Sequence, residues 1–63
     1  MYTETNYLQN LISNKTRVVV FMTNGFQMRG FITGYDQEAI LFFGDGTEKM
    51  LYKHAVSTIE PCK

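Results

Sequence analysis

A lysine and a histidine stand side by side near the end of the chain, at Lys53 and His54, directly after the aromatic residue Tyr52. Both side chains can donate hydrogen bonds, and the lysine adds a fixed positive charge. The pair falls where an apolar strand is expected to break into a tight turn. These residue types favour an electronegative ligand that accepts hydrogen bonds, such as a nucleotide.

The sequence offers little support for catalysis or metal binding at His54. It is the single histidine, and the single cysteine, Cys62, stands next to the C-terminus. A metal site would need further His or Cys ligands. Catalysis would need a nucleophile and an orienting group, and nothing places Ser57 and Asp36 together beside His54. We expect no enzyme, no metal and no cofactor, and an ordinary turn histidine is the alternative for His54.

The length and charge of the chain limit the classes of function. Sixty-three residues form one small domain, spanning 1–63, whose core is marginal alone, so self-association is the expected source of further stability. Six basic and six acidic residues give a net charge of zero. A nucleic-acid function must therefore depend on local charge placement and base stacking rather than on a general positive field.

The hydropathy pattern shows no run long enough to span a membrane and no charged-then-apolar leader. We therefore expect a cytoplasmic protein that makes no membrane contact.

The pattern of apolar residues predicts one short helix followed by five strands. Thr3 or Thr5 can cap the helix, which carries an apolar stripe and should end at Asn14. Strands rich in β-branched and aromatic residues follow. Their expected bounds are 17–23, 26–35, 37–43, 47–52 and 55–60, with Pro61 ending the last.

Glycines and apolar faces indicate how this sheet would bend and associate. Asn24-Gly25 predicts a two-residue hairpin turn with both residues at positive φ. Gly30 and Gly34 lie inside the second strand and predict bulges or bends, as a closing barrel requires. The first strand is apolar on both faces, so both should be covered. The fourth and fifth strands are possible edges, and exposed edges recruit strands from other chains.

Three segments together resemble the Hfq family of bacterial Sm-like RNA chaperones, over nearly the whole chain. The resemblance is closest to Gram-positive-like members or a diverged paralogue. It implies a mainly β fold: a small, bent, five-stranded antiparallel β-barrel of the Sm-like type with an N-terminal α-helix. It also implies assembly into a hexameric ring. The segments are Asn24-Gly25-Phe26-Gln27-Met28-Arg29-Gly30, Tyr35-Asp36, and Tyr52-Lys53-His54-Ala55-Val56-Ser57-Thr58-Ile59.

The resemblance implies a proximal RNA site at the central pore, formed by Gln37, Lys53 and His54, which would meet uridine-rich RNA. Glu38 departs from the family, which commonly places a base-stacking aromatic residue there, and Glu4 stands where the family often has glutamine. A carboxylate cannot stack on a base, and it brings negative charge towards the phosphates. We expect weakened uridine-rich binding.

The resemblance also implies a distal site for adenine-rich RNA on a strand–turn–strand segment. Aromatic rings and methionine accept flat purines, while asparagine and glutamine can read their edges. Phe26 and Met28 could instead simply close the barrel end, and Arg29 could contact phosphate or only solvent. The residues of this distal site are Phe21, Asn24, Gly25, Phe26, Gln27 and Met28.

A third family surface, the outer rim, is reduced here to Lys15 and Arg17, so RNA annealing that depends on an arginine cluster should be poor. The implied function is binding of single-stranded RNA, both small RNAs and messages, in post-transcriptional regulation of the stress-response type. The alternative is an Sm-like ring with reduced RNA affinity that acts as a protein-interaction scaffold. Asp36 is expected to accept hydrogen bonds in a tight turn, and Tyr52 to be an interface or core aromatic.

Overall fold

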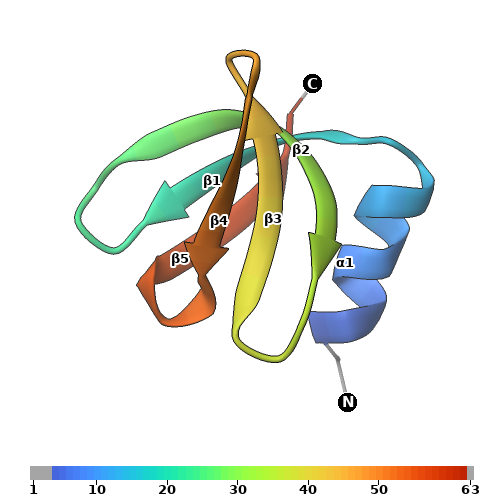
Figure 1. Cartoon of the computed structure of the whole chain (residues 1–63), viewed down its shortest axis with the longest axis horizontal. Coiled ribbons are helices and arrows are strands. Elements are labelled where there is room, and N and C mark those ends of the chain that lie inside the picture. Colours follow the sequence, from blue (N-terminus) through green and yellow to red (C-terminus); the bar gives the residue numbers. More distant parts are fainter. Residues whose placement is uncertain (1–3, 63) are drawn as a thin grey trace.

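The chain folds as one helix and a strongly bent five-stranded sheet (Figure 1) in a computed structural model that describes residues 4–62, with side chains from residue 6 onward. No helix in that range is long and apolar enough to cross a membrane. The elements, in chain order, are α1 (Glu4–Ser13), β1 (Arg17–Met22), β2 (Gln27–Tyr35), β3 (Ala39–Gly44), β4 (Thr47–Tyr52), the 3-10 turn η1 (Lys53–Ala55) and β5 (Val56–Pro61).

The helix ends at Ser13, directly before the predicted stop at Asn14, and its last carbonyls are capped by the backbone. The N–H of Lys15 donates to the Ile12 carbonyl at 3.1 Å, and the N–H of Thr16 donates to the Leu11 carbonyl at 3.0 Å. This pairing is a Schellman motif, and it places Lys15 at φ 51°, a position that glycine usually occupies. The prediction of Thr5 as the N-cap is wrong, because the helix already begins at Glu4. The alternative cap, Thr3, lies outside the described residues.

All the strand pairs are antiparallel, and the strands lie in the order β4-β3-β2-β1-β5. The two predicted edges, β4 and β5, are therefore confirmed. The ladder between β2 and β3 shifts register between Ile32 and Gly34, which confirms the bulge predicted at Gly34. Strand β5 runs one residue further than predicted, because Pro61 still pairs with Val18 at the end of the ladder.

The hairpin between β1 and β2 differs from the two-residue turn predicted for Asn24-Gly25. Gly25 has φ +92°, but Asn24 is not among the residues with positive φ. The N–H of Met22 donates to the Phe26 carbonyl at 2.8 Å, so these two residues close a three-residue loop. The Asn24 Oδ1 accepts a hydrogen bond from the Phe26 N–H at 3.0 Å. Asparagine thus stabilises the loop through its side chain, and only the glycine adopts the left-handed conformation.

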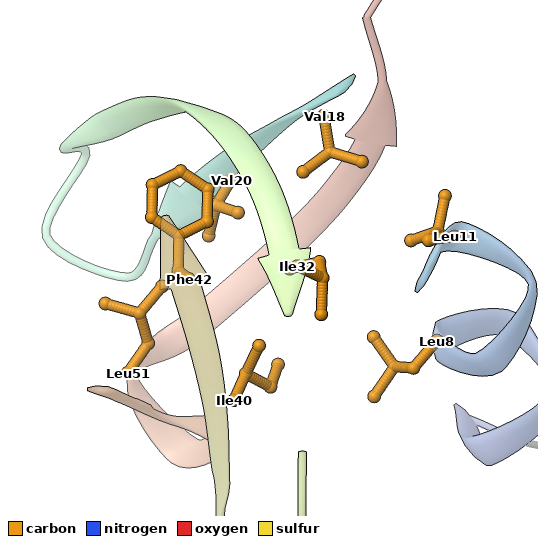
Figure 2. Close-up of a cluster of buried hydrophobic side chains, with 8 residues drawn as sticks. All are labelled: Leu8, Leu11, Val18, Val20, Ile32, Ile40, Phe42 and Leu51. Carbon is orange, nitrogen blue, oxygen red and sulfur yellow. The ribbon is translucent and has the colours of Figure 1, made fainter. Parts of the chain in front are cut away.

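The core lies between α1 and the concave face of the sheet (Figure 2). Leu8 and Leu11 reach from α1 towards Ile32, and Phe42 is 1% exposed. On β1, Val18 and Val20 are fully buried in this core. The eight core residues are Leu8, Leu11, Val18, Val20, Ile32, Ile40, Phe42 and Leu51.

Two glycines allow β2 and β3 to cross closely where the sheet bends. A Cβ on Gly30 would collide with the Phe43 carbonyl oxygen and would lie 2.9 Å from the Phe42 ring. A Cβ on Gly44 would lie 2.7 Å from the Arg29 carbonyl oxygen. Gly30 therefore marks a close backbone approach, which is one of the uses of glycine inside a strand.

Candidate nucleic-acid interface

The predicted proximal residues Gln37, Lys53 and His54 lie together along one open cleft of about 520 Å³. Glu38 and Tyr52 complete its lining. Two chain reversals meet here, namely the β2–β3 turn and η1, because the Lys53 N–H donates to the Glu38 carbonyl at 2.8 Å. Two donors, one amide and one carboxylate therefore share a surface that a nucleotide can reach.

Asp36 holds the turn that carries Gln37 and Glu38, as predicted. Its Oδ1 accepts hydrogen bonds from the N–H groups of Glu38 and Ala39, both at 2.8 Å. The two backbone donors, and to a smaller extent the positive charge of Lys53, lower the pKa of the Asp36 carboxyl. The turn is therefore fixed by an ionised side chain at neutral pH.

Two aromatic residues flank the cationic pair of the cleft. The Lys53 Nζ lies 5.8 Å from the centre of the Tyr35 ring, within the range of a cation–π contact. The hydroxyl of Tyr35 donates to Gln9 Oε1 at 2.8 Å, which joins this end of β2 to α1. His54 stacks on Tyr52 with ring centres 5.9 Å apart and planes 18° apart. Tyr52 is 54% exposed, so the core role considered for it is wrong.

The negative charge expected near the proximal site is present in the structure at Glu38, which is exposed and lines the cleft with Lys53 and His54. Glu4 is the first residue of α1, and its side chain lies outside the described part.

The predicted distal residues gather at the β1–β2 hairpin, which Figure 1 shows at the opposite end of the molecule from α1. Phe26 is 62% exposed at its tip, beside exposed Asn24 and Gln27. Met28 is half-buried and packs against the core. Met28 therefore helps to close the end of the barrel, whereas the Phe26 ring remains accessible to a flat ligand. Phe21, on β1, is half-buried.

The two expected rim residues, Lys15 and Arg17, are both exposed at the connection between α1 and β1. Arg29, on β2, is exposed as well.

Sequence reasoning missed two exposed aromatic residues on the outer face of the sheet. Phe31 is 39% exposed and Phe43 is 44% exposed. Both alternate with core residues, since Ile32 and Phe42 point inward. Strict two-residue alternation around Ile32 and Phe42 could have identified them.

The chain matches the family model described as Hfq protein over residues 4–63. It is 42% identical to an RNA-binding protein Hfq of Clostridium botulinum over 57 residues, which cover 90% of this chain and 67% of that protein. It is 45% identical to the RNA-binding protein Hfq of Clostridium acetobutylicum, covering 94% of this chain and 79% of the relative.

Its structure also resembles a crystal structure of Hfq that is described as a pleiotropic translational regulator. The two share a TM-score of 0.88 and 40% sequence identity, covering 90% of this chain and 95% of the other. The family model, the relatives and the fold agree, and the chain belongs to the Hfq family.

Proposed function

We propose that this protein binds single-stranded RNA, with adenine-rich segments on the β1–β2 hairpin as its preferred ligand, and acts in post-transcriptional regulation. The observation that carries the proposal is the Phe26 ring, 62% exposed between Asn24 and Gln27. An exposed aromatic ring next to side-chain amides can stack on a base and read its edge. The RNA-binding names of the relatives support RNA binding in general.

The proposal includes assembly into a ring through β4 and β5. These strands are the two edges of the sheet, so within residues 4–62 both have one side without a neighbouring strand. Joining β4 of one copy to β5 of the next is a head-to-tail contact, which closes into a ring when the rotation between copies divides a full turn evenly. A ring would repeat Lys53 and His54 around its centre and concentrate charge that the neutral chain lacks.

Replacement of the Phe26 ring tests the distal site. Phe26→Ala is expected to weaken binding of an adenine-rich oligonucleotide by about tenfold, because loss of one base stack costs about 1–3 kcal/mol. Phe43→Ala is the matched control, since it removes another exposed phenylalanine, which lies opposite Phe31 at the end of the β1–β2 ladder away from the hairpin loop. Fluorescence anisotropy at one fixed salt concentration measures both. Equal affinities of the two variants would contradict the distal site.

A second candidate function is a ring with reduced RNA affinity that serves as a protein-interaction scaffold. Glu38 favours it, because this carboxylate lines the same cleft as Lys53 and His54 and opposes phosphate there. Tight binding of adenine-rich RNA by the parent protein would exclude the scaffold function as the main one.

A further inference from the structure

The exposed side chains of Phe31 and Phe43 form a patch that the proposed RNA sites do not use. They lie directly opposite each other on β2 and β3. Directly opposite residues of antiparallel strands point to the same side of the sheet, so the two rings are neighbours on its outer face. Ile12 and Lys15 border them along a groove of about 410 Å³.

Opposite charges extend this patch at both ends. Arg17 on β1 lies directly opposite Phe31, and Glu48 on β4 lies directly opposite Phe43. Both are exposed. The hydroxyl of Thr33 donates to Glu48 Oε2 at 3.2 Å, which orients the carboxylate. Four strands thus present one cross-strand row in the order cation, aromatic, aromatic, anion, formed by Arg17, Phe31, Phe43 and Glu48; we name it the aromatic row.

We propose that the aromatic row is a self-association surface whose occupant is the aromatic row of a second copy of this chain. When two rows face each other about a two-fold axis between the rings, Arg17 of each copy meets Glu48 of the other. The phenylalanines then pack together in the middle. Such an isologous contact requires a self-complementary surface, and the row has that property in both charge and hydrophobicity.

The charge distribution favours a second copy over a nucleic acid as the occupant. A polyanion would be attracted by Arg17 and Lys15 but repelled by Glu48 at the other end of the row. A second copy satisfies both charges, and the net charge of zero means that no long-range repulsion opposes it. Because the outer face of the bent sheet is convex, the phenylalanines of the two copies would meet in the middle, and the longer Arg17 and Glu48 side chains would reach across the wider gaps at the ends.

The contact would be separate from the ring contact. It uses the outer face of the sheet, whereas the proposed ring uses the backbone edges of β4 and β5. It would therefore join two rings, or two single chains if no ring forms; we call this joined unit, the ring or the single chain, the basic assembly. A contact of four principal side chains from each copy is small, and small contacts correspond to weak, concentration-dependent association.

Sedimentation velocity on the RNA-free protein, over a wide concentration range, tests the proposal. The parent is expected to show species at multiples of the mass of its basic assembly, and added salt should reduce them. Arg17→Glu and Glu48→Arg should each weaken the association by about tenfold or more, because like charges then face each other. The double variant R17E/E48R exchanges the two charges and should restore it.

The charge exchange distinguishes the aromatic row from general stickiness and from misfolding. All three variants change exposed residues, and circular dichroism would verify that each remains folded. A parent that stays at its basic assembly at every concentration would overturn the proposal. So would a double variant no better than either single variant. Neither result bears on RNA binding, which is measured separately with oligonucleotides.

Discussion

At the scale of single residues, Asp36 and Glu38 have opposite roles on the same short turn. Asp36 stabilises the turn through two backbone hydrogen bonds. Glu38 follows it and lines the cleft of Lys53 and His54. The role of Asp36 could be predicted from the sequence, because an aspartate that begins a tight turn accepts hydrogen bonds locally. Prediction of Glu38 beside Lys53 and His54 required the family resemblance, since residues 38 and 53 meet only in the folded sheet.

Acid should weaken the fold in part through Asp36. Its pKa is lowered in the folded state, so its stabilising contribution is fully present at neutral pH and is lost as the pH falls through that lowered value. Asp36→Asn keeps an acceptor oxygen for the turn but removes the titration. We expect thermal unfolding midpoints of this variant to depend less on pH in the acid range than those of the parent. The same dependence in both proteins would contradict the assignment.

Removal of the Glu38 charge should strengthen uridine-rich binding. Glu38→Gln is nearly the same size and eliminates the repulsion between this carboxylate and phosphate. We expect affinity for a uridine-rich oligonucleotide to rise about twofold to fivefold, the scale of an exposed charge interaction. Asp45→Asn removes an equal charge at the exposed turn between β3 and β4, where asparagine tolerates the left-handed conformation, and serves as the control in the same anisotropy assay. An equal gain in both variants would indicate a general charge effect rather than a local one.

At the scale of the elements, the order and type of the helix and strands could be predicted from apolar periodicity and glycine placement. The backbone conformation could not be predicted at two connections, the β1–β2 hairpin loop and the end of α1. A hairpin around Asn24-Gly25 fits loops of two or three residues, and hydrogen bonds beyond the pair decide between them. The left-handed conformation of Lys15 also has no signature in sequence, because lysine is not a typical residue there.

Glycine at position 15 should stabilise the helix end. Lys15 has φ 51°, a conformation that costs a residue with a Cβ roughly 1 kcal/mol. We expect Lys15→Gly to raise the free energy of unfolding by about 0.5–1 kcal/mol, measured by urea denaturation. Asn14→Gly is the control, because Asn14 has no positive φ to relieve. A loss of stability in Lys15→Gly would show that the lysine side chain contributes more than the strain costs.

Alanine at position 30 should damage the crossing of β2 and β3. The added methyl group would meet the Phe43 carbonyl and the Phe42 ring, both of which are fixed by strand pairing and the core. We expect a loss of about 1–3 kcal/mol, as for other overpacked sites. Gly34→Ala is the comparison, since its methyl group would meet only the end of the Leu41 side chain at 3.3 Å. Equal losses in the two variants would contradict the argument.

At the scale of the whole molecule, the two edge strands and several exposed apolar residues indicate a chain that associates. Met50 on the edge strand β4 is 57% exposed. The sequence predicted the fourth and fifth strands as possible edges, and the strand order β4-β3-β2-β1-β5 confirms this prediction. It did not reveal the aromatic row, whose four members come from four strands and align only through the register of the sheet.

Light scattering should give a mass several times the 7.3 kDa of one chain. Met50→Asp is expected to shift the protein towards single chains, because it places a charge on the edge where the next copy would pack. Asn10→Asp is the control, since it adds the same charge at an exposed position on α1, which forms neither edge of the sheet. A parent protein that remains a single chain would contradict ring assembly.

We propose that the hairpin side of this protein binds adenine-rich RNA while the cleft beside Glu38 binds uridine-rich RNA poorly. The most direct test is fluorescence anisotropy of the parent protein with labelled adenine-rich and uridine-rich oligonucleotides, side by side at one fixed salt concentration. We expect tight binding of the adenine-rich strand and weak binding of the uridine-rich strand. Binding of neither strand would contradict the RNA-binding function, and tighter binding of the uridine-rich strand would contradict the assignment of the two sites.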